Sequence, residues 1–220
     1  MNLLDQFRKR LIARQNNPRS EKPVIITCFG DSVTHGVFEV YNEKDKTLVF
    51  TYDAKSTYHA RLKELFDIFY PAAAVSIVNA GVNGDTAVNA LARVNRDVLD
   101  ISPDLCILCF GLNDSLSGMP GLQDFRLAIS EILDRLSGIP LIIMTPCMMN
   151  TKICRQAIGE TFVEAAEKCM KIQTGGVLKA YVEVLREQAH IRGILLCDEY
   201  ARFERWAASG IDTDQLLANG

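Results

Sequence analysis

The sequence has no long hydrophobic run, no block of like charge and little histidine. No apolar stretch approaches the ~20 residues that a helix needs to cross a bilayer. The 27 acidic and 24 basic residues are interspersed and give a formal charge of −3, without the basic patch that binds nucleic acid or anionic membranes. Neither a membrane span nor a nucleic-acid partner is therefore expected. The only candidates for a histidine base are His35, His59 and His190.

The cysteines form neither a disulfide framework nor a zinc motif. The seven thiols are scattered at positions 28, 106, 109, 147, 154, 169 and 197. Only Cys106 and Cys109 have C-x-x-C spacing, and within one strand this spacing directs the two side chains to opposite faces of the sheet. An odd number of cysteines without a framework favours a reducing compartment, so a cytoplasmic location is predicted.

At 220 residues the chain fits one domain, 1–220, with a core large enough to be stable without disulfide bonds or structural metals. Residues 1–22 are predicted to form an amphipathic helix over 3–14 followed by a polar linker. Charged residues interrupt the apolar ones in this helix, which excludes the continuous core of a signal peptide. We expect the helix to pack on its own domain or on a partner subunit, rather than on a membrane surface.

Strand-like and helix-like segments alternate along the rest of the chain. Apolar runs predict strands at 24–29, 75–80, 105–110, 139–145 and 193–197. Helical spacing predicts helices near 57–69, 87–99, 122–136 and 176–190, and a short one after the last strand. Residues 36–55 are predicted to be a loop and 147–172 an irregular polar segment. Near-continuous apolar strands separated by helices predict an α/β fold, a three-layer α/β/α domain with a five-stranded parallel sheet of flavodoxin-like kind.

Polar residues follow three of the predicted strands. Gly30-Asp31-Ser32 comes after the first, Gly81-Val82-Asn83-Gly84-Asp85 after the second and Gly111-Leu112-Asn113-Asp114 after the third. Parallel strands end at one edge of the sheet, where open α/β sheets build their sites. A serine hydroxyl, a glycine N–H and an asparagine amide are expected to meet there.

These three blocks resemble the SGNH (GDSL-like) hydrolase superfamily, in the family's order and over most of the chain. The resemblance implies a serine esterase that cleaves a small acyl or acetyl ester without metal or cofactor. It implies that Ser32 is the nucleophile and that the oxyanion is bound by the N–H groups of Ser32 and Gly81 and the amide of Asn113. Asp31, Asn83 and His35 are predicted to line the substrate pocket. Capping by Ser32, a plain turn at Gly81 and an Asx-turn at Asn113 are the alternatives.

The family's C-terminal Asp-x-x-His, which supplies the base and its carboxylate, is absent: no aspartate precedes any histidine by three residues. Asp198 is followed at this spacing by Ala201, so the base and its acid are unassigned. The sequence predicts a domain that lacks its C-terminal segment, an inactive 220-residue form and self-association through the exposed face or through helix 3–14. The alternatives are a non-catalytic ligand-binding protein and, ranked last, a flavodoxin-like nucleotide binder.

Overall fold

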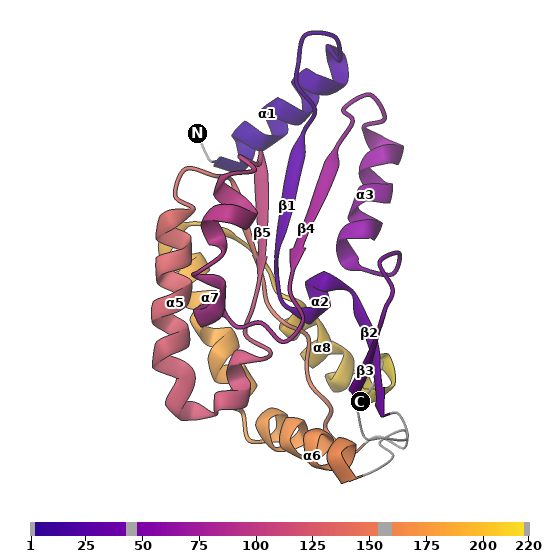
Figure 1. Ribbon diagram of the computed structural model, residues 1–220, viewed down its shortest axis with the longest axis vertical. Helices are drawn as coiled ribbons and strands as arrows, with labels where there is room; N and C mark the ends of the chain where they lie inside the picture. Colours follow the sequence, from indigo (N-terminus) through magenta and orange to yellow (C-terminus); the bar gives the residue numbers. More distant parts are fainter. Residues whose placement is uncertain (1–2, 43–47, 154–159, 218–220) are drawn as a thin grey trace.

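A computed structural model describes residues 3–42, 48–153 and 160–217. Its main sheet has five parallel strands in the order β4-β1-β5-β6-β7 (Figure 1). The bounds are β1 Ile25–Gly30, β4 Ser76–Gly81, β5 Leu105–Cys109, β6 Leu141–Met144 and β7 Leu195–Cys197. Numbered along this sheet alone, the order is 2-1-3-4-5, that of flavodoxin-like folds. The predicted α/β class and five-stranded parallel sheet are confirmed.

The strands are apolar because the sheet is covered on both faces. Phe29, Cys106 and Leu108 enter one hydrophobic core, whereas Cys28 and Cys109 enter the other. Cys106 and Cys109 therefore lie on opposite sides of the sheet, as their spacing predicted. Burial raises the pKa of the Cys28 thiol to about 12, so this cysteine is an uncharged core residue.

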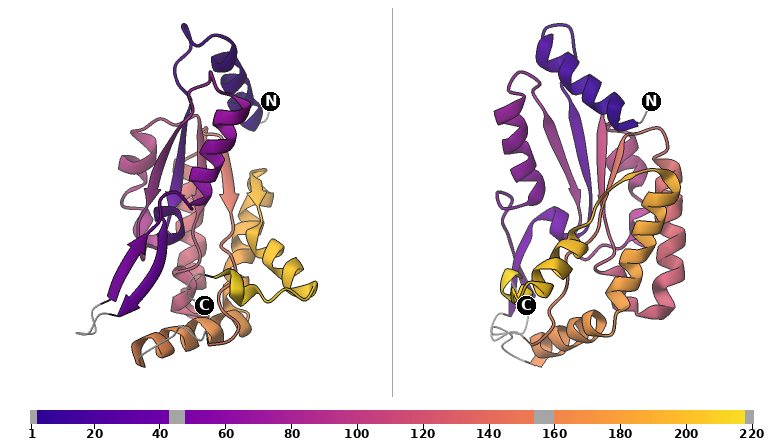
Figure 2. Two further views of the ribbon diagram at one scale, coloured as in Figure 1. Left: turned by 90° about the vertical axis from the view of Figure 1, so that its right-hand side faces the viewer. Right: turned by 180° about the vertical axis from the view of Figure 1, so that it is seen from behind.

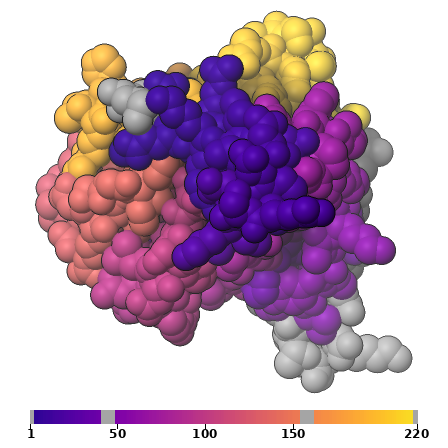
Figure 3. All heavy atoms as spheres, turned by 90° about the horizontal axis from the view of Figure 1, so that it is seen from above, coloured from indigo at the N-terminus to yellow at the C-terminus, as the bar shows by residue number. Residues whose placement is uncertain are grey.

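Helices complete the two outer layers (Figure 2). One face is covered by α1 (Leu3–Asn16) and α3 (Tyr58–Phe69), and the other by α4 (Ala87–Ala90), α5 (Leu122–Arg135) and α7 (Val177–Arg192). Figure 3 shows α1, in indigo, lying across the top of the molecule. Leu11 of α1 is buried, and the Phe7 ring meets Phe66 of α3 edge-on at 6.3 Å. The N-terminal helix thus packs on its own domain.

Two segments predicted to be irregular are regular, so those predictions were wrong. Residues 36–55 contain an antiparallel hairpin of β2 (Val37–Asn42) and β3 (Leu48–Tyr52), both rich in β-branched and aromatic residues. Residues 147–172 include most of α6 (Glu160–Thr174), which buries Ala166 and, seven residues later on the same face, Gln173. In both segments, charged residues obscured the apolar pattern.

The helix predicted over 87–99 is broken. After α4 the chain turns and forms a π-helical segment, η1 (Asn95–Leu99). The Asp100 N–H donates to the Asn95 carbonyl at 2.9 Å, a bond that spans five residues instead of four. The segment buries Val98 completely, so the π-helical turn is part of the core.

Short helices occupy the loops. They are α2 (Ser32–His35), η2 (Asp114–Ser117), η3 (Met119–Gly121), α8 (Glu199–Ala208) and η4 (Thr213–Leu216). α2 begins two residues after the end of β1, and η2 begins five residues after the end of β5, both at the carboxyl edge of the sheet. Within the described ranges, no helix is long and apolar enough to cross a membrane.

Candidate functional site

The carboxyl ends of three adjacent strands form the candidate site. β1 lies between β4 and β5, with Gly30 opposite Gly81 on one side and Cys109 on the other. The segments that leave these strands therefore start at the same edge, beside α2 in Figure 1. The predicted convergence of the loops with Ser32, Gly81 and Asn113 is what this register produces.

Ser32 is the first residue of α2, and Asp31 is its N-cap. The Asp31 carboxylate accepts from the Val33 N–H at 3.0 Å, so helix capping is the role of Asp31 and not of Ser32. The half-buried Ser32 hydroxyl has no hydrogen-bond partner among the described residues. Its N–H lies in the first turn, where a helix offers no carbonyl four residues earlier. Both groups are free to meet a ligand.

Asp31 lies beneath the site and not on its wall. Asp31 is only 1% exposed, so the prediction that it contacts substrate is not supported. Burial, together with the nearby carboxylates of Asp114 and Asp85, raises the pKa of Asp31 to about 7, against the lowering effect of the hydrogen bond from the Val33 N–H. Asp31 thus holds the backbone of α2 in place.

Gly81 is required by packing. A β-carbon there would lie 2.2 Å from the His35 backbone nitrogen, so only glycine lets α2 rest on the end of β4. Its N–H donates to Asn79 Oδ1 at 3.0 Å. The Gly81 N–H is therefore already engaged, and it would have to leave this bond to serve as the predicted oxyanion donor.

Gly84, three residues further, has the properties expected of Gly81. It lies in the turn closed by the Asp85 N–H and the Val82 carbonyl at 3.2 Å, with φ of 73°. Its N–H has no acceptor among the described residues, and no atom lies within 4 Å of where its β-carbon would be. Asn83 is half-buried in the same turn. The Asn-Gly pair was the sequence signal for this turn.

Asn113 joins the loop that follows β5 (the asparagine loop) to the loop of Gly84 that follows β4 (the glycine loop). Its Nδ2 donates to the Asp85 carbonyl at 2.9 Å and it makes no side-chain cap on η2, so the Asx-turn alternative is not what the structure has. Asp114 accepts from the Gly111 and Ala87 N–H groups at 3.0 and 2.8 Å. Asp114 thus joins the segment after β5 to the start of α4, and burial raises its pKa to about 6.

The three histidines differ in environment. His59 is buried: its Nε2 lies 2.9 Å from the Thr34 carbonyl and its Nδ1 3.3 Å from Thr57 Oγ1. Both ring nitrogens are engaged, and burial lowers the pKa of this histidine. The half-buried His35 ring lies against the Tyr52 ring of β3, tilted by 51° with the ring centroids 4.7 Å apart, and His190 is exposed near the end of α7. Within the described ranges, none is hydrogen-bonded to Ser32.

Asp198 is fully engaged elsewhere. It caps α8 by accepting from the Ala201 N–H at 3.0 Å, and it binds Arg186 Nε at 2.8 Å and Thr145 Oγ1 at 3.2 Å. A carboxylate with these partners orients a helix, so the structure gives Asp198 no part in a triad.

Arg93, which the sequence did not single out, lies directly under the site. Its guanidinium is buried and donates to the Gly30 and Ala80 carbonyls and to Asp85. Arg93 is the seventh residue of the predicted helix 87–99, and no sequence pattern indicates that it lies under the site. Two of its acceptors are backbone carbonyls, which every residue has.

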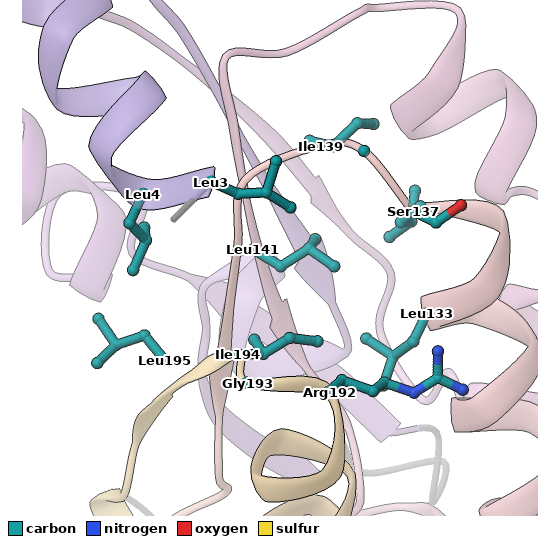
Figure 4. A pocket seen from close by; sticks show the side chains of 12 residues that line it. Leu3, Leu4, Leu133, Ser137, Ile139, Leu141, Arg192, Gly193, Ile194 and Leu195 are labelled. Carbon is teal, nitrogen blue, oxygen red and sulfur yellow. The ribbon is translucent and has the colours of Figure 1, made fainter. Parts of the chain in front are cut away.

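Two cavities lie away from Ser32. One of about 550 Å³ is at the opposite, amino edge of the sheet, lined by leucine and isoleucine side chains such as Leu3 and Leu141 with Arg192 at its side (Figure 4). A second of about 510 Å³ lies between η2 and α6, over Leu116, Ile172 and Val177. Among the described residues, no three His, Cys, Asp or Glu side chains are grouped as metal ligands.

Comparisons with known proteins agree with this architecture. A lipase/acylhydrolase from Enterococcus faecalis superposes with a TM-score of 0.60 at 22% identity, covering 87% of this chain and 82% of that one. A catalytic mutant of Axe2, an acetylxylan esterase from Geobacillus stearothermophilus, superposes with a TM-score of 0.60 at 18% identity, covering 84% and 80%. These likenesses establish the fold.

Sequence similarity establishes the family. An uncharacterized lipoprotein of Bacillus subtilis, YqeF, is 30% identical over 127 residues, 54% of this chain; the chain thus spans about half of that relative, 47% of its length. A model of the GDSL-like Lipase/Acylhydrolase family matches residues 28–219. The match includes all three sequence blocks and the strands that precede the second and third. The chain therefore belongs to the GDSL-like lipase/acylhydrolase family.

Proposed function

We propose that the protein is a serine hydrolase of small acyl esters and that Ser32 is its nucleophile. The observation that supports this most directly is the unpartnered Ser32 hydroxyl at the carboxyl edge of β1, between the loops of Gly84 and Asn113, in a chain of this family. Ser32 Oγ would attack the ester carbonyl carbon and release the alcohol, leaving an acyl-serine that water then hydrolyses.

The oxyanion donors in this proposal are the Ser32 N–H, the Gly84 N–H and Asn113 Nδ2. Gly84 takes the place first expected for Gly81, because its N–H is free while that of Gly81 is bonded to Asn79. Asn113 Nδ2 carries two hydrogens, and only one is used by the Asp85 carbonyl. Loss of one such donor typically costs about 2.7–4 kcal/mol of transition-state stabilisation.

The proton acceptor is unassigned. No described histidine is hydrogen-bonded to Ser32, and both nitrogens of His59 are engaged. We therefore propose that this 220-residue chain turns over slowly, near the residual ~10³–10⁴-fold acceleration that binding and an oxyanion hole give without a complete triad.

The test is the intact mass of the protein after reaction with a fluorophosphonate, with and without added imidazole as a diffusible base. We expect one adduct, formed faster with imidazole, and none in Ser32→Ala. Ser117→Ala, which changes an exposed serine of η2, is the matched control and should react like the unmodified protein. An adduct that persists in Ser32→Ala would refute the assignment of Ser32.

No adduct at any imidazole concentration would favour the second candidate, a binding protein that keeps the pocket. The lack of a histidine on Ser32 within the described ranges is the observation that favours it. Such a protein should be stabilised against heat by a non-hydrolysable acetyl ester analogue without consuming p-nitrophenyl acetate. The nucleotide-binding alternative rests only on the shared strand order.

For the substrate we propose acetyl or other short acyl esters, on sugars or on lipids. Axe2 is an acetylxylan esterase, and this likeness favours an acetylated sugar as the substrate. The exposed aromatics Phe38, Phe50 and Tyr52 of the hairpin that follows α2 offer an apolar surface to either kind of alcohol. Relative rates on p-nitrophenyl acetate, butyrate and octanoate test the acyl length, and we expect acetate to be fastest. Cytoplasmic location and self-association remain predictions.

A further inference from the structure

The guanidinium of Arg93 is enclosed under the candidate site and uses its donors on several different segments. Nε donates to Asp85 Oδ2 at 2.7 Å, Nη1 to the Ala80 carbonyl at 2.7 Å and Nη2 to the Gly30 carbonyl at 2.9 Å. Nη1 also reaches Asp97 Oδ2 at 3.0 Å. The residue is 8% exposed, so solvent has little access to these bonds.

The three acceptors nearest the site each fix a different part of it. The Gly30 carbonyl is one residue before Asp31 and two before Ser32. The Ala80 carbonyl precedes Gly81 at the end of β4. The third acceptor, Asp85, follows Gly84, and its own carbonyl accepts from Asn113 Nδ2 at 2.9 Å. One planar cation thus links the loops that supply the nucleophile and the proposed oxyanion donors.

The surroundings hold this cation in one orientation. Arg93 Cζ lies 4.4 Å from the centroid of the Phe29 ring and 6.0 Å from that of Phe110. The Asp85 and Asp97 carboxylates balance its charge, with 7% and 17% of their side chains exposed. A buried ion pair of this kind often adds little net stability compared with apolar residues of the same volume. Its fork geometry fixes the relative positions of its acceptors, which an apolar side chain cannot do.

We infer that Arg93 is a positioning residue: it sets the distance between Ser32 and the oxyanion donors of the glycine and asparagine loops. The expected effect on catalysis rests on the proposed function. The expected effect on the loop positions rests on the contacts of Arg93 alone. Displacements near 1 Å at a reacting centre lower rates about 100-fold. Removing the fork should therefore lower kcat and the fluorophosphonate labelling rate of Ser32 about 100-fold, with KM changed less than about twofold because ground-state binding is kept.

The test compares Arg93→Lys and Arg93→Gln with Arg96→Gln. Arg96 pairs with the same Asp97 carboxylate but has 74% of its side chain exposed, which makes it a matched loss of one cation from the same segment. Labelling rate, kcat and KM are measured together with amide hydrogen exchange of peptides over 30–36, 81–86 and 111–117. We expect faster exchange in these three peptides in both Arg93 variants, and no change in α7 or in Arg96→Gln.

Lysine is the informative substitution if the glutamine variant fails to fold. Its single ammonium keeps the buried charge but cannot reach three separated acceptors, so it should leave kcat low and exchange fast. Full activity with unchanged exchange in Arg93→Lys would overturn the inference, as would faster exchange spread evenly over the whole protein. If the unmodified protein neither labels nor turns over, the proposed function fails, while the exchange pattern still decides whether Arg93 positions the loops.

Discussion

Replacing Asp31 by asparagine is expected to stabilise the protein above neutral pH. The Asp31 carboxyl is 1% exposed, and burial together with Asp114 and Asp85 raises its pKa from the ordinary 3.8 to about 7. The folded state therefore keeps a proton that the unfolded state releases. Asparagine retains the oxygen that caps the Val33 N–H, and it carries no charge to bury.

The sign and size of the effect follow from linkage. Below pH 3.8 both states are protonated and the contribution of Asp31 to stability is complete. Between about pH 4 and 7 only the unfolded state loses its proton, so the free energy of unfolding falls as the pH rises. At 1.36 kcal/mol per unit of pKa, the total loss is on the order of 4 kcal/mol. Asp31→Asn removes this loss, so its advantage should grow with pH and level off near pH 8.

The assay is urea unfolding followed by circular dichroism at pH 5, 6, 7 and 8. Asp100→Asn, which neutralises an exposed carboxylate at the end of η1, is the control and should follow the unmodified protein at every pH. Asp114 is buried in all three proteins, so the difference between the curves reports the loss of the Asp31 carboxylate together with its repulsion by Asp114 and Asp85. A stability difference for Asp31→Asn that is the same at pH 5 and pH 8 would refute the reasoning.

Two further substitutions test packing and hydrogen bonding at the same edge of the sheet. Gly81→Ala places a β-carbon 2.2 Å from the His35 backbone nitrogen, and we expect a loss of about 3 kcal/mol, visible as a Tm lower by about 6–12 °C; an unchanged Tm would contradict the close approach of α2 to β4. Thr145→Val keeps the shape of a buried side chain but removes an Oγ1 that donates to Asp198 and accepts from the Tyr200 N–H at 3.0 Å. Urea unfolding should give a loss of about 1–3 kcal/mol, whereas a loss below about 0.5 kcal/mol would mean that water replaces the hydroxyl.

The sheet could be predicted from sequence because each of its strands is an apolar run with a turn at its end. Burial on both faces removes the alternation that would mark a half-exposed strand, so the run itself is the signal. The same reasoning failed on α3. Helical spacing places Leu65 and Phe69 beside Leu62 and Phe66, yet Leu65 and Phe69 are 50% and 68% exposed, and the helix packs through Leu62 and Phe66. A helix beside the edge strand β4 covers a narrower stripe than periodicity suggests.

The candidate site was predictable only where a local pattern defines it. Ser32 and Asn113 lie in the short segments that follow two neighbouring parallel strands, so the strand order alone places them at the carboxyl edge of the sheet. Gly81 and Gly84 are alike in residue type, and the structure distinguishes them by the bond from the Gly81 N–H to Asn79 and by the positive φ of Gly84. Arg93 could not be found, since Gly30 and Ala80 bind it through carbonyls that every residue has.

The π-helical turn of η1 makes the length of this segment matter more than its side chains. One residue removed from 95–99 would change the five-residue hydrogen-bonded turn into a four-residue one and shorten the connection to β5. Val98, which is completely buried, would then leave the core, and the chain would enter β5 out of step with its partner Ile26 on β1. Substitutions at the exposed positions of this turn should be readily accepted, while a single-residue deletion should not.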